Sequence, residues 1–275
     1  RGPRRALGVP TRPSTSVARV ADLNGWIERD VASVWHGFTQ MEAYAGNRPV
    51  IVERGEGREL IDVEGNRYLD AISSLWVTTL GHGVPELDQA VRDQLERVAH
   101  STLLGNGNRI VIELSEALAA KVPVDRPRFL YASDGAAAVE QALKIAFQFW
   151  TNQGITTKTT YLAFGGAYHG DTTGSLSLGD GGFGTDIFDP LRFPVLRCPT
   201  LGEPGSVDQA VAMIAEHADE LAAVVLEPLV QGAAGMALVP PEAVAAVAAA
   251  AREHDVLVVH DEVATGFGRT GTLFA

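Results

Sequence analysis

The chain has 275 residues, 46% of them hydrophobic, which is enough to bury a substantial core in one large domain or parts of two. Its formal net charge of −12 argues against a nucleic-acid partner, because such a partner needs a basic surface. No apolar run approaches the roughly 20 residues that cross a membrane, so we expect no membrane partner. The single cysteine, Cys198, is expected to be a packed thiol, and this usage is typical of a reduced compartment such as the cytoplasm.

The N-terminal part of the chain opens with a segment that we expect to be disordered, a lead-in over residues 1–22. Residues 1–21 hold five arginines, three prolines and no acidic side chain, and the prolines interrupt any amphipathic helix. A short helix should follow from Leu23. Three strand-like runs come next and predict a small antiparallel meander: Val50–Glu53, Glu59–Val63 and Tyr68–Ala71.

From residue 81 onward, helical and strand-like segments alternate, which is the pattern of βαβ units around a parallel sheet. The expected helices are Pro85–Ala99, a long helix that begins near Ser133, Val207–Ala218 and Pro241–Glu253. The expected strands are Phe129–Ala132, Tyr161–Phe164, Ala222–Leu226 and Val256–Val259, the last with the apolar pattern of a strand buried on both faces. We therefore predict an α/β fold with a mostly parallel sheet sandwiched by helices.

Candidate functional residues follow the predicted strands, where open α/β sheets place their ligand-binding groups. The segments are Ser133-Asp134-Gly135-Ala136-Ala137, Tyr168-His169-Gly170, Glu227-Pro228-Leu229-Val230-Gln231 and the single residue Asp261. A glycine at a helix N-terminus lets backbone amides approach an anion, and an aromatic side chain can stack on a flat ring. Each segment alone also has a plainer interpretation: a tight turn, a packing tyrosine, a buried structural glutamate or a capping aspartate.

The segment after the last strand, Asp-Glu-Val-Ala-Thr-Gly-Phe-Gly-Arg-Thr-Gly, resembles the signature of the class III, fold type I, pyridoxal-phosphate aminotransferases. The resemblance implies pyridoxal 5'-phosphate as cofactor and a homodimer as the assembly. It also implies roles for five residues. Asp261 would pair with the pyridine nitrogen, Tyr168 would stack on the ring, Gln231 would bond the phenolic oxygen, and Gly135 and Ala136 would bind the phosphate. Ala136 stands where the family often has Ser or Thr, so only backbone amides could serve there.

The same resemblance implies a division into domains. Residues 23–80 would contribute to a small domain, and residues 81–275 would form the cofactor-binding large domain, incomplete at its C-terminus. His169 is expected to support neighbouring groups or to pack, and Glu227 to be structural. No metal site is expected.

Several segments narrow the resemblance to the branch that uses 8-amino-7-oxononanoate as amino acceptor, forming 7,8-diaminononanoate in biotin biosynthesis. They are Trp35–Met41, Ser73–Trp76, Tyr168–Thr172 and Glu227–Gly232. In that branch Trp76, Leu75, Phe38 and Tyr168 would contact the substrate, although Trp76 could instead be a core residue. Phe38 replaces a tyrosine that is frequent in members using S-adenosylmethionine, so the donor could be S-adenosylmethionine, lysine or another amine.

The lysines in the sequence decide whether the chain alone can catalyse amino transfer. Members of the family hold the cofactor through a Schiff-base lysine, and the resemblance places that lysine beyond Ala275. Only Lys121, Lys144 and Lys158 are present: the first ends a helix, the second suggests an exposed i,i+4 pair with Glu140, and the third lies in a polar loop. We therefore expect the chain alone to be inactive and its full-length parent to be active. The alternatives are another class III enzyme for ω-amino acids or 4-aminobutyrate, or a non-catalytic cofactor-binding homologue.

Overall fold

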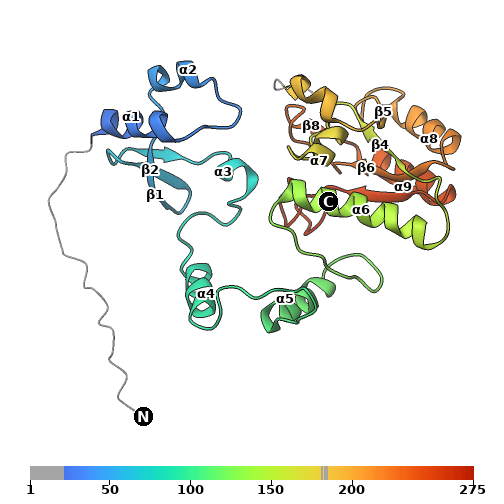
Figure 1. Ribbon diagram of the computed structural model, residues 1–275, viewed down its shortest axis with the longest axis horizontal. Coiled ribbons are helices and arrows are strands. Elements are labelled where there is room, and N and C mark those ends of the chain that lie inside the picture. Colours follow the sequence, from blue (N-terminus) through green and yellow to red (C-terminus); the bar gives the residue numbers. More distant parts are fainter. Residues whose placement is uncertain (1–21, 181, 183–184) are drawn as a thin grey trace, which may run out of the picture. The chain divides into compact units, whose positions relative to one another are not determined.

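The computed structural model describes residues 22–180, 182 and 185–275, so the predicted lead-in lies outside the described residues except for Asp22. Contacts divide the chain into two compact units, Arg1–Ala99 and His100–Ala275 (Figure 1). The assignment of residues 23–80 to a small domain stays a prediction. Within the described part of the chain, no helix is both long and apolar enough to cross a membrane.

The first unit contains the predicted antiparallel meander. Its sheet has the order β1-β2-β3, formed by β1 (Val52–Glu56), β2 (Glu59–Asp62) and β3 (Arg67–Leu69). The helical elements of this unit are α1 (Leu23–Ser33), α2 (Met41–Tyr44), η1 (Ala45–Asn47), α3 (Ser73–Trp76) and α4 (Pro85–Leu95). Asp22 caps α1 by accepting the amide of Gly25 at 3.0 Å, which satisfies one of the amides that a helix start leaves unpaired.

α3 is a single turn of the left-handed kind. Ser73, Ser74, Leu75 and Trp76 have φ values of 53°, 51°, 61° and 73°, although none of them is a glycine. Such a conformation costs roughly 1–2 kcal/mol per residue, because the side chain approaches the following carbonyl. The surrounding structure must therefore hold this turn in place.

The second unit is built on a four-stranded parallel sheet with the order β5-β4-β6-β9. Its strands are β4 (Thr160–Phe164), β5 (Leu196–Cys198), β6 (Leu221–Leu226) and β9 (Leu257–His260), beside a small pair, β7 (Val230–Gln231) and β8 (Ala237–Leu238). The helical elements are α5 (Arg109–Ala119), α6 (Gly135–Asn152), α7 (Thr173–Leu178), η2 (Thr185–Leu191), α8 (Ser206–Glu216) and α9 (Pro241–Glu253). The predicted α/β architecture is confirmed.

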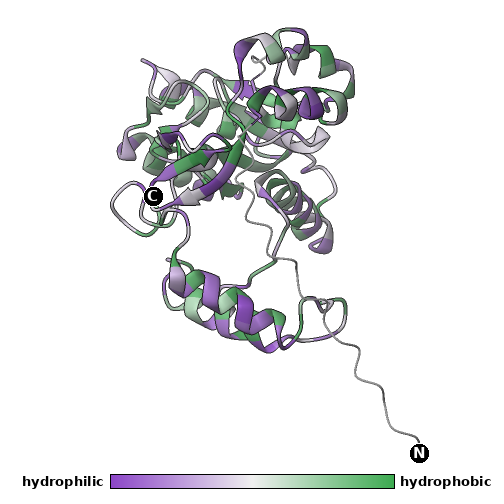
Figure 2. Ribbon diagram, turned by 90° about the vertical axis from the view of Figure 1, so that its left-hand side faces the viewer, coloured by the Kyte–Doolittle hydropathy of each residue, from purple (hydrophilic) through white to green (hydrophobic). Residues whose placement is uncertain are grey.

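Two hydrophobic cores lie on opposite faces of this sheet. Alternate strand residues, including Leu162 and Val224, pack with α8 and α9, while their neighbours Tyr161 and Ala223 pack with α6. This alternation follows from the two-residue period of a strand and gives three layers, helix–sheet–helix. The helices carry hydrophobic and hydrophilic residues side by side in Figure 2, as expected when one face meets solvent.

One predicted strand is absent, and the burial expected for another was wrong. Phe129–Ala132 is not a strand: it pairs with no strand that the structure describes, and Leu130 is 63% exposed. A strand needs a neighbour for its backbone hydrogen bonds, and apolar composition cannot supply one. The last strand was expected to be buried on both faces, but β9 is only half-buried because it pairs with β6 alone and lies at the edge of the described sheet.

Candidate active site

The candidate site lies where β4, β6 and β9 end, because these three strands are adjacent and parallel. β6 and β9 pair in register, Leu226 opposite His260, so Glu227 and Asp261 follow at equivalent positions. The segment after β4 brings Tyr168 and His169 to the same edge. Residues far apart in the sequence therefore meet here because parallel strands share one polarity.

Asp261 and His169 form a buried pair. His169 Nδ1 lies 2.8 Å from Asp261 Oδ2, and the side chains are 0% and 6% exposed. Because an ionised carboxylate only accepts hydrogen bonds, we assign the proton to Nδ1. Oδ1 of Asp261 accepts the amide of Val263 at 3.1 Å. Both carboxylate oxygens are thus anchored, yet each keeps a second lone pair for another donor.

Glu227 ties two loops of the site together. Its Oε2 accepts the amide of Tyr168 at 3.1 Å, and its Oε1 accepts the amide of Gly232 at 3.3 Å. Burial raises the pKa of Glu227, and the nearby carboxylate of Asp261 acts in the same direction. The structure thus gives Glu227 the loop-bridging contacts of a structural group.

Gln231 adds a second link between the same loops and leaves an acceptor unused. Its Nε2 donates to the carbonyl of Gly165 at 3.1 Å. Its Oε1 is buried and has no hydrogen-bond partner among the described residues, and the same is true of His169 Nε2. Unsatisfied buried polar atoms are uncommon and call for an explanation such as an absent ligand.

The loop after β4 packs directly on the start of α6. A Cβ added to Gly170 would lie 2.4 Å from Ala136 Cβ and 2.7 Å from Ala136 Cα, so only glycine fits. Asp134 caps α6 by accepting the amide of Ala137 at 2.8 Å, and this bond lowers the pKa of Asp134. Asp134 also interacts with the amide of Ala136, so an anion bound here would share that amide with Asp134 and would contact the amide of Gly135.

Tyr168 is half-buried beside these groups. Its hydroxyl donates to Asp171 Oδ2 at 2.7 Å, which fixes the direction of the ring. Burial raises the pKa of Tyr168, and the bond to Asp171 adds to the rise, so the phenol stays protonated near neutrality.

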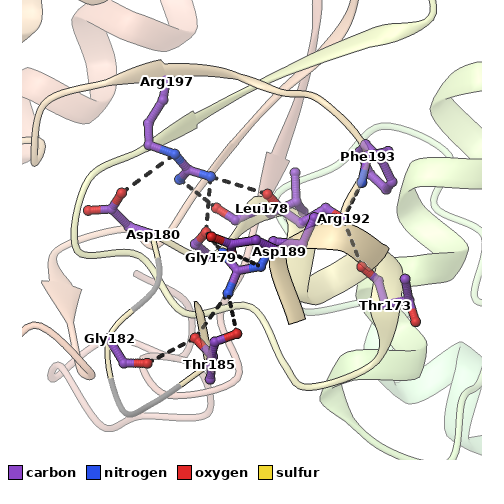
Figure 3. A network of polar contacts seen from close by, with 11 residues as sticks. Thr173, Leu178, Gly179, Asp180, Gly182, Thr185, Asp189, Arg192, Phe193 and Arg197 are labelled. Carbon is purple, nitrogen blue, oxygen red and sulfur yellow. Dashed lines mark hydrogen bonds and ion pairs between the residues drawn. The ribbon is translucent and has the colours of Figure 1, made fainter. Parts of the chain in front are cut away.

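Arg192 and Arg197 both donate to the carbonyl of Gly179 and hold the segment after α7 in place (Figure 3). Arg197 donates to the carbonyls of Leu178 at 2.9 Å and Gly179 at 3.0 Å, which satisfies the C-terminal end of α7. It also lies 3.5 Å from Asp180, whose other oxygen accepts the amide of Gly166 at 2.9 Å. Arg197 thus stabilises the loop after β4 through Asp180.

The contact predicted for Glu140 from the sequence was wrong. Glu140 was expected to form an exposed pair with Lys144, but its Oε1 accepts the hydroxyl of Thr172 at 2.7 Å and the amide of Gly174 at 2.8 Å. Glu140 therefore joins α6 to the start of α7. The partners are 32 and 34 residues away, so local spacing held no signal for this contact.

The lysines lie away from Asp261 or point to solvent. Lys158 was expected in a polar loop, but it is 7% exposed and donates to the carbonyls of Ala218, Leu221 and Asp255. These groups precede or begin the strands, so Lys158 lies at the amino edge of the sheet, opposite Asp261. Lys121 and Lys144 are exposed.

The predicted substrate residues Phe38, Leu75 and Trp76 belong to the first unit. Phe38 is 69% exposed and Leu75 is 65% exposed, whereas Trp76 is half-buried. Phe38 has a φ of 52°, and the other two lie in the left-handed turn α3. The structure therefore groups Leu75 with Trp76, and it groups Gly135, Ala136, Tyr168, Gln231 and Asp261 within the second unit.

Comparisons with known proteins point to one family. A model of the family described as Aminotransferase class-III matches residues 41–275. The adenosylmethionine-8-amino-7-oxononanoate aminotransferase of Nitratidesulfovibrio vulgaris is 45% identical over 278 residues, covering 96% of this chain and 51% of that protein. The protein of the same name from Anoxybacillus flavithermus is 42% identical, covering 92% of this chain and 58% of that protein.

Solved structures agree in fold. The adenosylmethionine-8-amino-7-oxononanoate aminotransferase of Methanocaldococcus jannaschii superposes with a TM-score of 0.89 at 40% identity, covering 92% of this chain and 58% of that one. An omega transaminase from Pseudomonas jessenii in complex with PMP has a TM-score of 0.82 at 29% identity, covering 90% of this chain and 58% of that one. The chain thus spans a little over half the length of these relatives.

Proposed function

Because the chain belongs to the class-III aminotransferase family, we propose that its full-length protein is a pyridoxal-phosphate-dependent transaminase. We propose 8-amino-7-oxononanoate as the amino acceptor and 7,8-diaminononanoate as the product, a step of biotin biosynthesis. The observation that carries the proposal is the buried His169–Asp261 pair at the carboxyl edge of the sheet. The names of several relatives support the choice of acceptor.

The residues at this edge fit the chemical groups of the cofactor. The site offers a buried carboxylate for a ring nitrogen, an aromatic ring for a ring face and a helix N-terminus for a phosphate. Oε1 of Gln231, which is buried and has no partner among the residues that the structure describes, and the close packing of Gly170 on Ala136 are further features expected of a ligand cradle. The cofactor, when bound, supplies a protonated ring that draws in the electrons of a substrate carbanion.

The residues of this chain would bind and orient that group. Asp261 would keep the ring nitrogen protonated, since a nearby negative charge raises the pKa of a basic nitrogen. His169 would act through Asp261, because its Nδ1 fixes the direction of the carboxylate. Tyr168 would cover one face of the ring and exclude water, Gln231 would bond the phenolic oxygen, and Gly135 and Ala136 would offer amides to the phosphate.

Proton transfer needs a lysine that these residues do not supply. Lys158 lies at the opposite edge of the sheet, and Lys121 and Lys144 are exposed. We therefore propose that the full-length protein supplies this lysine after Ala275. We also propose that the 275-residue chain alone binds the cofactor without turning over substrate. We also propose a homodimer and a cytoplasmic location, the latter supported by a single, unpaired cysteine.

The test uses the full-length protein, 8-amino-7-oxononanoate and each candidate donor in turn, S-adenosylmethionine or lysine. We expect turnover with one of them and a visible absorption band of bound pyridoxal phosphate. Asp261→Asn should retain the band and lower kcat on the order of 100-fold, the usual effect of removing one preorganised electrostatic group. Asp208→Asn, at an exposed site on α8, is the matched control and should leave kcat unchanged.

The alternative functions give different results. Turnover confined to ω-amino acids or 4-aminobutyrate would replace the proposed acceptor. Cofactor binding without turnover of any amine would favour the non-catalytic homologue. Full activity of Asp261→Asn would contradict the role of Asp261.

A further inference from the structure

The left-handed turn α3 is held by a pair of residues that flank it in the sequence. Asp70 directly follows β3, and its Oδ1 accepts the amide of Ser74 at 3.0 Å. Its Oδ2 lies 2.8 Å from Nε2 of His82, and the Asp70 side chain is 5% exposed. The buried carboxylate of Asp70 therefore joins the turn to His82, which ends the segment 70–82.

Both ends of this segment are attached to the hairpin between β1 and β2. At the entry, the amide of Asp70 donates to the carbonyl of Arg58 at 2.9 Å. At the exit, Gly57 and His82 exchange two backbone hydrogen bonds, of 2.9 Å and 2.6 Å. A Cβ on Gly81 would lie 2.6 Å from the carbonyl oxygen of Gly57, so the exit is closely packed.

The turn itself has little burial to hold it. Ser74 and Leu75 are exposed, and Leu75 has 65% of its surface accessible. Backbone bonds from Trp76 to Ile72 at 2.7 Å and from Thr78 to Ser73 at 2.9 Å close the turn, but they do not select its hand. The hydrogen bond from the amide of Ser74 to Asp70 favours the left-handed form, because it fixes the direction of that amide in the second residue of the turn.

We propose that Asp70 and His82 are positioning residues for the amino acceptor, and that they act by holding α3 in its left-handed form so that Leu75 and Trp76 are presented together. This inference rests on the proposed function and on the expectation, implied by the family resemblance, that these two side chains contact the acceptor. Residues kept in strained conformations commonly lie at ligand sites, where the surrounding structure over-determines them. Asp70 and His82 need not contact substrate themselves.

The test compares three variants of the full-length protein. Asp70→Ala should raise the KM for the keto acceptor about tenfold and leave kcat and cofactor absorbance unchanged, because only the presentation of the substrate residues is lost. Adding Ser74→Gly to Asp70→Ala should restore most of the KM, because glycine adopts a positive φ without strain. Asp62→Ala is the matched control: Asp62 also caps a turn of this unit, accepting the amides of Glu64 and Asn66, and should leave KM unchanged.

Two measurements keep the inference testable if Asp70→Ala does not fold or the acceptor is wrong. Ser74→Gly alone should raise the midpoint of thermal unfolding, whereas glycine in an ordinary right-handed turn lowers it. Asp70→Asn keeps the oxygen that accepts the amide of Ser74, and its NH2 group can donate to Nε2 of His82 in the other imidazole tautomer. This variant should therefore keep the slow amide exchange of Ser74, which His82→Leu should accelerate. A lowered midpoint, or an unchanged KM in Asp70→Ala with a working acceptor, would overturn the inference while the proposed function stands. Loss of all acceptor turnover in the unmodified protein would count against the proposed function alone.

Discussion

The thiol of Cys198 shows how burial changes the chemistry of a single residue. The side chain is 2% exposed, and its sulfur lies 3.4 Å from the sulfur of Met213. Burial raises its pKa from the ordinary 9.0 to about 11. A thiol of this kind is a poor nucleophile because little thiolate is present and reagents cannot reach it.

We predict that Cys198 reacts with a disulfide reagent at pH 8 only as fast as the protein opens. Adding urea to the unfolding midpoint should make the reaction rapid. Between pH 9 and 11 the folded state keeps a proton that the unfolded chain loses, so folding stability should fall as the pH rises. Rapid labelling under native conditions would contradict this account; Cys198 is the sole cysteine, so the signal has one source.

His169 shows the limit of reading residues one at a time. Its position after a strand predicted a supporting or packing role, and the structure gives it a bond to Asp261, 92 residues away. Nothing in the local pattern distinguishes that bond from burial among apolar groups. Which residues would follow β4, β6 and β9 was readable from the sequence, whereas the bonds among them depend on how the strands are ordered.

At the scale of elements, hydrophobic patterns predicted the larger elements of the second unit that pack on the sheet, α6, α8, α9, β4, β6 and β9, but not α5, α7 or the strand β5. α9 begins and ends where expected, and β4, β6 and α8 differ from their predicted bounds by one or two residues. The patterns were informative because these elements pack on the sheet. They gave no warning of α3, since the sequence Ser-Ser-Leu-Trp has no glycine and its left-handed form depends on Asp70, outside the turn.

The contact between the loop after β4 and the start of α6 leads to a prediction on Gly170. Gly170→Ala should disturb this contact, since the new Cβ would meet Ala136 at 2.4 Å. Overpacking of this kind costs about 1–3 kcal/mol, in addition to the strain of a left-handed backbone. We expect lower stability and weaker binding of pyridoxal phosphate, measured by urea unfolding and by titration of the cofactor band.

Gly154→Ala is the control for this prediction. Gly154 has a φ of 79°, but no atom lies within 4 Å of its added Cβ. It should therefore show the backbone strain alone, about 1–2 kcal/mol, and unchanged cofactor binding. Equal losses in the two variants would mean that the packing on Ala136 is unimportant.

At the scale of the whole second unit, Lys158 connects segments that meet at the amino edge of the sheet. Its ammonium donates to the carbonyls of Asp255 at 2.9 Å and Leu221 at 3.4 Å and to that of Ala218, and it lies 4.6 Å from the ring centre of Trp150. Burial lowers the pKa of Lys158, so the charge itself is unfavourable and the bonds to the carbonyls offset it.

We predict that Lys158→Met lowers the free energy of unfolding by about 2–4 kcal/mol, because it leaves buried carbonyls without donors. Lys144→Met removes a lysine of the same chain from an exposed position and should change stability by less than about 0.5 kcal/mol. Urea unfolding of both variants in the full-length protein measures the difference. A neutral effect of Lys158→Met would show that water can replace the ammonium at this edge.

The register between β6 and β9 has a consequence for how such a site can diversify. Leu226 faces His260, so the spacing between Glu227 and Asp261 is set by the ladder of the sheet rather than by any loop. Slipping one strand by a single residue would put His260 or Glu262 where Asp261 stands and would turn every side chain of β9 to the other face. A change in the relative position of the two carboxylates would therefore also disrupt the hydrophobic cores. Loops that follow the strands, and the separate unit that carries Leu75 and Trp76, can accumulate changes without altering that spacing.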